Sequence, residues 1–178
     1  MKSPKGVATR PTGSRVKQTL FDIVAAAIPG CRFLDAFAGN GGIGLEALSR
    51  GAARVVLVEA SAASAAAIRD NVAALGSLGG DVQVLRQDAR VALAGLADQG
   101  WHFDVVYLDP PYESDLYEGL LELVGSRRLL DRAGVLVAEH FHKRVLPETI
   151  GGLCRRRTVR VGDHQLSFYR WEEGDEAR

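Results

Sequence analysis

The chain has 178 residues, of which 47% are hydrophobic and 25% are charged, and its 22 basic side chains balance 22 acidic ones. This mixture is typical of a globular protein and excludes an intrinsically disordered chain. At this length we expect one domain over residues 1–178, with residues 1–17 as a basic N-terminal extension. Two cysteines, Cys31 and Cys154, exclude a disulfide scaffold and offer no zinc-type ligand spacing. No signal peptide or membrane-spanning run is visible, so we expect a cytoplasmic protein without metal or membrane partner.

The neutral total conceals an uneven distribution of charge. Residues 1–17 carry five basic side chains and no acidic one, and residues 143–160 carry six basic side chains and one acidic one. Residues 18–142 and 161–178 have net charges of −7 and −3. Basic runs of this kind are often solvated surface, but they are also typical of a nucleic-acid contact.

Apolar periodicity predicts a helix over Arg15–Ile28, which Pro29-Gly30 ends. Short strands rich in Val, Ile and Leu then alternate with helices rich in Ala and Leu. The predicted strands are Arg32–Phe37, Arg54–Ala60, Val82–Asp88, Phe103–Asp109 and Gly134–Phe141, and the predicted helices lie near Gly42–Arg50, Ala62–Leu75, Arg90–Ala97 and Asp115–Val124. This alternation predicts an α/β fold with a parallel sheet covered on both faces. Two last strands, Cys154–Val161 and Gln165–Trp171, are joined by a turn too short for a crossover and predict an antiparallel hairpin.

A glycine-rich turn follows the first predicted strand. Gly39, Gly41 and Gly44 form a GxGxxG pattern between a strand and a helix, and Glu59 ends the next strand 20 residues after Gly39. Glycines at such a turn let the backbone approach a ligand, and a carboxylate at this distance is suited to ribose hydroxyls. The simpler interpretation is a tight turn without a ligand.

Asp35, at the tip of the first strand, separates two classes of cofactor. It would repel the pyrophosphate of a nicotinamide or flavin dinucleotide, whereas it would attract the ammonium and sulfonium of S-adenosylmethionine. Asp35 therefore favours the methyl donor. The alternative for Asp35 is a carboxylate that caps a helix or braces the loop.

The fourth predicted strand runs into Asp109-Pro110-Pro111-Tyr112. Two prolines fix the backbone and remove two N–H donors, which leaves a rigid loop with carbonyl acceptors, an acid and an aromatic ring. This set suits a planar base with an exocyclic amine: Tyr112 stacks on the ring, while Asp109 and the Pro110 carbonyl accept the amine hydrogens. Methyl transfer then depends on positioning and on acceptors for the developing positive charge.

These motifs resemble those of class I S-adenosylmethionine-dependent methyltransferases that act on exocyclic amines. Further segments resemble the RsmD-type bacterial 16S ribosomal RNA guanine-N2 methyltransferases, over most of the chain from Arg10 to Trp171. They are Arg10-Pro11-Thr12, Arg15-Val16-Lys17, Leu20-Phe21-Asp22-Ile23, Leu34-Asp35-Ala36-Phe37-Ala38-Gly39 and the segment from Gly44 to Ala52. One departure is at the N-terminus, where nine residues precede Arg10 and the family usually has a glycine- and arginine-rich hairpin.

The resemblance implies a Rossmann-like, seven-stranded, mostly parallel sheet whose last strand is antiparallel. It also implies methylation of one guanine N2 in 16S rRNA, within a partly or fully assembled 30S subunit, by a monomer. The implied cofactor-binding residues are Asp35, Phe37, Gly39, Asn40, Gly41, Glu59, Ala60, Asp88 and Ala89, and the implied target-base pocket is Asp109, Pro110, Pro111 and Tyr112.

A guanine must leave its stack to reach such a pocket, so the RNA has to be held by its phosphates. The best candidates are Arg10, Arg15 and Lys17, which lead into the first helix. The run Arg155-Arg156-Arg157 is a second candidate. Strand alternation predicts that Arg155 and Arg157 share one face and that Arg156 lies on the other.

Three other functions compete with this one. An adenine-N6 DNA methyltransferase could use the same Asp-Pro-Pro-Tyr pocket, although the chain has no room for a separate base-reading region. A dinucleotide-dependent oxidoreductase is opposed by Asp35 and by the lack of a substrate domain. A non-catalytic module that binds S-adenosylmethionine or RNA is disfavoured by the complete pocket. Methylation of a pyrimidine carbon needs a cysteine nucleophile at the site. Cys31 precedes the first predicted strand and Cys154 begins a late one, so neither is placed for this role.

Overall fold

The computed structural model describes residues 11–76, 80–111 and 115–172. In chain order the helices are α1 (Pro11–Val24), the short 3₁₀ helix η1 (Ala25–Ala27), α2 (Gly44–Ser49), α3 (Ala62–Leu75), α4 (Ala89–Asp98) and α5 (Leu116–Ser126). The strands are β1 (Arg32–Asp35), β2 (Arg54–Val58), β3 (Asp81–Leu85), β4 (Phe103–Leu108), β5 (Leu130–Phe141), β6 (Thr149–Ile150), β7 (Leu153–Val161) and β8 (His164–Trp171). Every element predicted from periodicity is present, with its ends shifted by a few residues.

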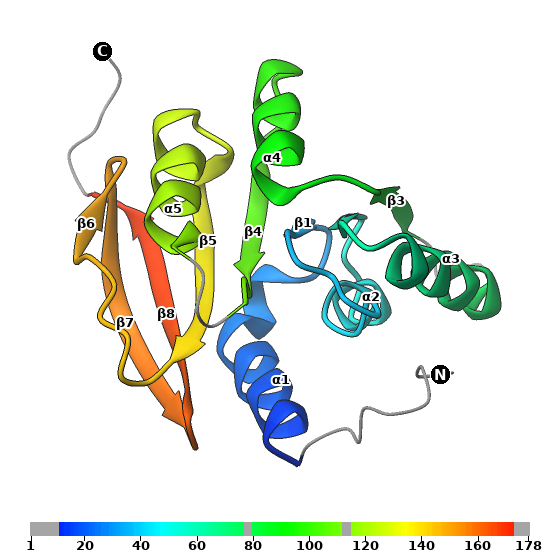
Figure 1. Ribbon diagram of the computed structural model, residues 1–178, viewed down its shortest axis with the longest axis horizontal. Coiled ribbons are helices and arrows are strands. Elements are labelled where there is room, and N and C mark those ends of the chain that lie inside the picture. Colours follow the sequence, from blue (N-terminus) through cyan, green and yellow to red (C-terminus); the bar gives the residue numbers. More distant parts are fainter. Residues whose placement is uncertain (1–10, 77–79, 112–114, 173–178) are drawn as a thin grey trace.

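All the strands of the described residues form one sheet, in the order β3-β2-β1-β4-β5-β8-β7-β6 (Figure 1). The strands from β1 to β5 are parallel, and β8 pairs antiparallel with β5. The predicted seven strands become eight because Thr149–Ile150 pairs with the start of β7. A two-residue strand has too little periodicity to be recognised in a sequence.

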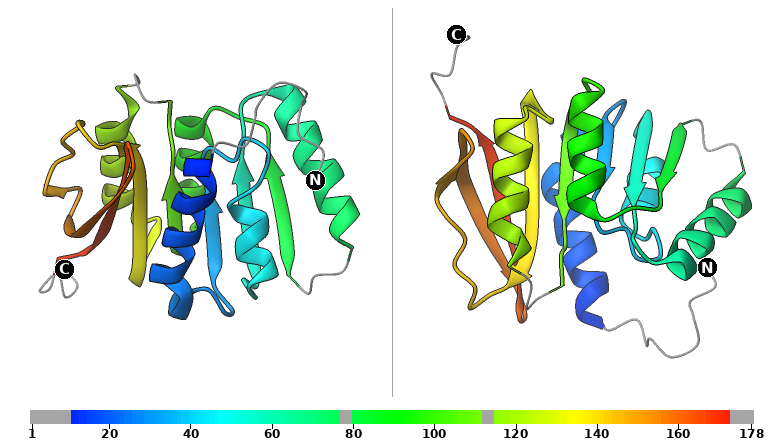
Figure 2. Two further views of the ribbon diagram at one scale, coloured as in Figure 1. Left: turned by 90° about the horizontal axis from the view of Figure 1, so that it is seen from below. Right: turned by 45° about the horizontal axis from the view of Figure 1, so that its top comes forward.

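Two hydrophobic clusters hold helices on the two faces of the sheet. Helices α4 and α5 pack on one face and α1, α2 and α3 on the other, as the two views of Figure 2 show. Adjacent residues of β1 illustrate this arrangement, because Phe33 faces the α1 side and Leu34 faces the α4 side. Both side chains are fully buried, which explains why the sequences of the parallel strands are continuous apolar runs. No helix among the described residues is long and apolar enough to cross a membrane.

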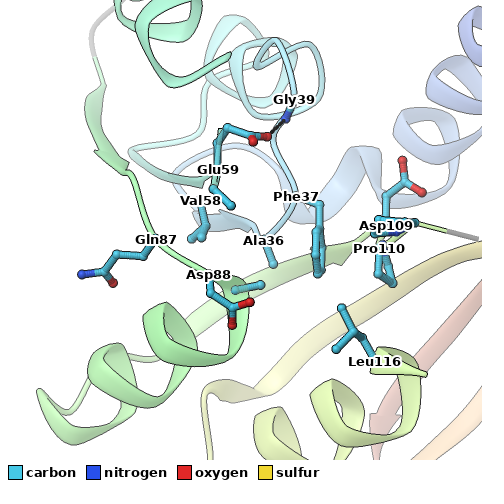
Figure 3. Close-up of a pocket in the computed structure, with 13 residues that line it drawn as sticks. Ala36, Phe37, Gly39, Val58, Glu59, Gln87, Asp88, Asp109, Pro110 and Leu116 are labelled. Carbon is cyan, nitrogen blue, oxygen red and sulfur yellow. Dashed lines mark hydrogen bonds between the residues drawn. The ribbon is translucent and has the colours of Figure 1, made fainter. Parts of the chain in front are cut away.

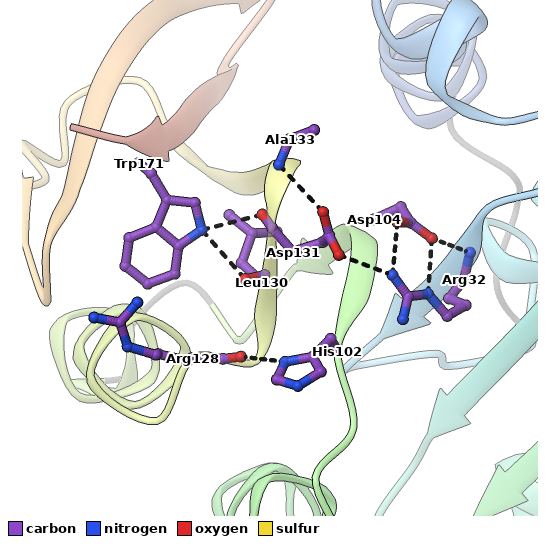
Figure 4. A network of polar contacts seen from close by, with 8 residues as sticks. All are labelled: Arg32, His102, Asp104, Arg128, Leu130, Asp131, Ala133 and Trp171. Carbon is purple, nitrogen blue, oxygen red and sulfur yellow. Dashed lines mark hydrogen bonds and ion pairs between the residues drawn. The ribbon is translucent and has the colours of Figure 1, made fainter. Parts of the chain in front are cut away.

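An ion-pair network ties together the amino ends of β1, β4 and β5 (Figure 4). The Arg32 guanidinium donates to both carboxylate oxygens of Asp104, at 2.9 and 3.0 Å, and to Asp131 at 3.1 Å. The backbone N–H of Arg32 also donates to Asp104, at 2.7 Å. These bonds hold the pKa of Asp104 below its usual value, against a smaller opposing effect of burial. The network lies at the edge of the sheet opposite the candidate site.

The C-terminal hairpin contains a β-bulge that overturns one prediction. Arg155 pairs with Tyr169 and Arg157 with Phe168, so Arg156 is an extra residue on β7. As a result Arg156 and Arg157 line the same groove, whereas the Arg155 guanidinium donates to the Leu146 carbonyl on the α5 side of the sheet. The expectation that Arg155 and Arg157 share a face was wrong, because simple alternation holds only for an unbulged strand.

Candidate active site

The loops after β1, β2, β3 and β4 surround a cavity of about 510 Å³ at the carboxyl edge of the sheet (Figure 3). This is the edge at which ligands bind in open α/β sheets. The residues that line it are Ala36, Phe37, Gly39, Val58, Glu59, Ala60, Gln87, Asp88, Ala89, Asp109, Pro110, Pro111 and Leu116. Nine of them were expected from the sequence: Phe37, Gly39, Glu59, Ala60, Asp88, Ala89, Asp109, Pro110 and Pro111.

Glu59 connects the glycine turn to the second strand. One carboxylate oxygen accepts the backbone N–H of Gly39 at 2.9 Å, and the other accepts that of Ser61 at 2.7 Å. Gly39 and Gly41 have φ of 55° and 82°, a conformation that side chains disfavour. The turn therefore needs these glycines, and Glu59 fixes its position while each of its carboxylate oxygens can still accept a further hydrogen bond.

Asp35 is placed differently from the expectation. Its side chain is buried, and it accepts the backbone N–H of Gly44 at 3.2 Å and that of Phe37 at 3.4 Å. Burial raises its pKa to about 7, against the lowering effect of these two bonds. Asp35 is not among the residues that line the cavity, and its two bonds are of the kind expected of a carboxylate that braces the loop, while its role toward the methyl donor stays a prediction.

Asn40 and Gly41 also lie outside the cavity wall. The Asn40 side chain accepts the N–H of Gly42 at 3.0 Å, and its backbone carbonyl accepts the side-chain amide of Asn71 at 3.2 Å. A Cβ on Gly41 would meet Leu45 at 3.1 Å, so this glycine packs against α2. Both residues shape the turn without facing the cavity in this structure.

Asp88 is the N-cap residue of α4 and faces the cavity opposite Phe37 (Figure 3). Its carboxylate caps the helix by accepting the Arg90 backbone N–H at 2.9 Å, and the Arg90 guanidinium donates to it at 3.2 Å. These interactions lower the pKa of Asp88, so it is a carboxylate at neutral pH. Gln87 lines the same wall and was missed, because nothing in its sequence position distinguishes it.

Asp109, Pro110 and Pro111 form the wall that follows β4. Burial, followed by the charges of Glu139 and Asp35, raises the pKa of Asp109 to about 8. The Pro110 carbonyl accepts the Tyr117 hydroxyl at 3.3 Å, and the same hydroxyl lies 3.0 Å from the Glu139 carbonyl. Tyr112, expected to stack on the target base, lies outside the described residues.

Sequence reasoning missed a group of polar side chains beside Asp109. Glu139 of β5 is only 6% exposed and accepts hydrogen bonds from the Tyr107 hydroxyl and from His164 Nδ1, the latter at 2.5 Å. The sequence signal for this group was Glu139, an acid inside the apolar segment Gly134–Phe141, together with His164 in the turn of the C-terminal hairpin. An acid in a buried strand rarely stands without a partner.

The basic residues expected to hold RNA are only partly accounted for. Arg10 lies outside the described residues. Arg15 is exposed on the first turns of α1, as an RNA contact requires. The Lys17 ammonium lies 3.3 Å from the Glu46 carboxylate, so part of its charge is already paired within the protein.

Comparisons with known proteins agree with the motifs. The model of a family described as Conserved hypothetical protein 95 matches residues 1–170. YlbH of Bacillus subtilis is 36% identical over 170 residues, which cover 96% of this chain and 92% of YlbH. Ribosomal RNA small subunit methyltransferase D of Escherichia coli K12 is 31% identical over 174 residues, which cover 98% of this chain and 85% of that protein.

Solved structures extend the comparison to the fold. A conserved hypothetical protein of Streptococcus pyogenes superposes with a TM-score of 0.79 at 30% identity, covering 88% of this chain and 95% of that one. The protein yhhF of Escherichia coli superposes with a TM-score of 0.78 at 31% identity, covering 92% and 88%. The chain therefore belongs to the Conserved hypothetical protein 95 family, the family of the RsmD-type methyltransferases.

Proposed function

We propose that this protein transfers a methyl group from S-adenosylmethionine to the exocyclic N2 amine of a guanine in small-subunit ribosomal RNA. The observation that carries the proposal is a single cavity whose opposite walls carry different groups. Glu59 and Asp88 lie on one side, Asp109 and Pro110 lie on the other, and Phe37 stands between them (Figure 3). Relatives named as ribosomal RNA small subunit methyltransferases, at 31% identity over nearly the whole chain, support rRNA as the substrate.

The residues of the cavity fit the methyl donor. Glu59 has lone pairs left for two ribose hydroxyls, and Asp88 is an anionic acceptor at the adenine end. Gly39, Ala60 and Ala89 are small enough to let a ligand approach the backbone. S-adenosylmethionine supplies an electrophilic methyl group on a cationic sulfur, and the carboxylates around this cavity favour a cation.

On the target side, Asp109 and the Pro110 carbonyl orient the amine by accepting its two hydrogens. The lone pair of the amine would then be free to attack the methyl group that bound S-adenosylmethionine would supply, with the thioether leaving as the C–S bond breaks. Positive charge develops on the nitrogen, and acceptors fixed in advance stabilise it without reorganisation. The amine afterwards releases its extra proton to water, so no separate base is required.

Asp35, Asn40 and Gly41 act in this scheme through the shape of the glycine turn. Asp35 accepts two backbone N–H groups of the segment that carries Phe37 and Gly44, and thereby orients the wall of the cavity. Arg15 remains our candidate for a phosphate contact. The expected 30S substrate and the monomeric state stay predictions.

The test uses tritiated methyl donor with 30S subunits from cells lacking this gene, with naked 16S RNA and with DNA. We expect label in RNA, as N2-methylguanosine after digestion to nucleosides. Asp109→Ala should abolish transfer while leaving methyl-donor affinity within a few-fold, and Asp70→Asn on the exposed face of α3 serves as the control. Label in N6-methyladenine of DNA would instead establish the competing adenine methyltransferase.

A further inference from the structure

A second groove lies on the α1 face, where the end of α1 and η1 meet β5, β7 and β8. Its volume is about 330 Å³. Its apolar walls are Ile23, Val24, Ala26, Ala27, Val135 and Phe168, and its polar lining consists of Arg156, Arg157 and Arg170. None of these nine lining residues is acidic. The groove is separate from the cavity at the carboxyl edge, with which it shares no residue.

The β-bulge creates this gathering of charge. In a regular strand Arg156 and Arg157 would point to opposite faces, but the extra residue places both at the groove beside Arg170. Arg155, by contrast, leaves the groove and lies near the Glu148 carboxylate at 3.7 Å. The hairpin therefore pairs one arginine with an acid and leaves three cations together.

These three guanidiniums keep donors for a ligand. Arg156 donates to the Trp171 carbonyl at 3.1 Å, and Arg170 donates to the Ala133 carbonyl at 2.9 Å. Each bond uses only part of a group with five donors, and neither neutralises the charge. Within the described ranges, the Arg157 side chain makes no hydrogen bond or ion pair. Like charges gathered without a counter-ion are unfavourable until an anion binds, and a planar fork of donors matches phosphate.

We propose that this arginine groove binds one unpaired nucleotide of the RNA substrate, with its phosphate on the guanidiniums and its base against the apolar wall. The partner rests on the proposed function, since an RNA methyltransferase must hold the strand from which the target base is extruded. Base faces pack on apolar and arginine surfaces of this kind. Ala26 is exposed and forms part of the wall, so the groove is open to an RNA strand that approaches from solvent.

The groove lies on the same face of the sheet as Asp109 but toward the amino edge, since Arg156 donates to the Trp171 carbonyl and Arg170 to the Ala133 carbonyl. Phe168 pairs with Val137, which pairs with Tyr107, two residues before Asp109 on the same face of the sheet. Ordinary strand spacing and rise place the backbone of Phe168 roughly 12 Å from that of Asp109. The left view of Figure 2 shows α1 on this face with the β7–β8 hairpin beside it. Phe168 is the groove residue nearest to Asp109 along this path, so we expect a single-stranded segment of the RNA to run from the cavity along this face to the guanidiniums.

The test compares three variants in methyl transfer to 30S subunits and in binding of a labelled 16S fragment at several salt concentrations. Arg156→Gln/Arg157→Gln should raise the KM for RNA by about tenfold, with kcat and methyl-donor affinity unchanged. The slope of log affinity against log salt should fall by about 1, as for a lost phosphate contact. Ala26→Phe, which fills the apolar wall without changing charge, should raise the KM and leave the slope unchanged.

The matched control is Arg69→Gln, an exposed arginine on α3 at the far edge of the sheet, which should change neither quantity. Thermal unfolding of each variant should match the wild type. An unchanged KM in the double variant, or an equal loss in Arg69→Gln, would overturn the arginine groove while leaving the methyltransferase intact. An Ala26→Phe protein with wild-type KM would overturn the base contact. A wild-type protein that transfers no methyl group to RNA would instead refute the proposed function.

Discussion

The raised pKa of Asp109 predicts how methyl transfer depends on pH. The ionised carboxylate is a stronger acceptor than the neutral carboxyl group and stabilises the positive charge that develops on the amine nitrogen, and the pKa of Asp109 in the protein is about 8. About one tenth of the molecules carry the carboxylate at pH 7 and about nine tenths at pH 9. With both substrates far below their KM values the rate reports the free enzyme, so it should rise about tenfold over this interval.

A neighbouring carboxylate offers an independent check of the cause. Glu139 raises the pKa of Asp109 by its charge, so Glu139→Gln should move the rise in rate to lower pH. Gln keeps an acceptor for the Tyr107 hydroxyl, which protects the packing. The measurement is the initial rate between pH 5.5 and 9 (about a half-unit per step) for wild type, Glu139→Gln and Asp109→Asn. A rate that stays constant over this range, or a rise that Glu139→Gln leaves in place, would refute the reasoning.

Three further variants test the cofactor wall, the packing of α5 and the network opposite the site. Glu59→Gln should weaken methyl-donor binding by about 10- to 100-fold in calorimetry, because an amide cannot accept both backbone N–H groups, whereas the exposed Glu122→Gln should not. Gly125→Ala should lower the free energy of unfolding in urea by about 1–3 kcal/mol, since its Cβ would lie 2.2 Å from the Gly151 carbonyl oxygen. Gly119→Ala, on the same helix, has no atom within contact distance of its Cβ and should raise the free energy of unfolding by about 0.5–1 kcal/mol. Asp104→Asn should cost about 1 kcal/mol at pH 7, because the pKa of Asp104 is lowered in the fold, and the difference should vanish as the pH falls through that lowered pKa; a cost independent of pH would contradict the ion-pair explanation.

The cavity wall was largely predictable because each of its members follows directly from chain order. A parallel sheet brings the carboxyl ends of its strands to one edge, so the residues after β1, β2, β3 and β4 meet whatever the details of packing. The rule places Glu59, Asp88 and Asp109 at this edge, the 20-residue distance from Gly39 also pointed to Glu59, and the family resemblance implied Asp88. Their roles as ligands remain proposals, since the position of a carboxylate does not say what it binds.

Side-chain direction was harder to predict than position. Asp35 sits at the expected strand tip, yet its carboxylate turns inward to Phe37 and Gly44, because the tight glycine turn exposes backbone N–H groups that need acceptors. The bulge at Arg156 also arises from a contact between separate segments, because β7 has one residue more than β8 at this point of the pairing. Neither feature has a periodicity of its own, so both depend on contacts between distant segments.

The neutral net charge acquires a physical meaning once the charges are placed. Asp35, Asp109 and Glu139 lie on one face of the sheet near its carboxyl edge. Burial is the largest cause that raises the pKa of Asp35 and of Asp109; the charge of Glu59 adds to it at Asp35, and the charges of Glu139 and Asp35 add to it at Asp109. Arginines gather instead on the hairpin, at a groove on the same face. The two groups would attract opposite ligands: a cationic methyl donor at the cavity and an anionic strand at the groove. Because each group is destabilised by its own repulsion, binding of either ligand should relieve strain that the fold carries alone. A protein with this division of charge needs no overall positive charge to hold RNA, since the field that the strand experiences is local to the groove.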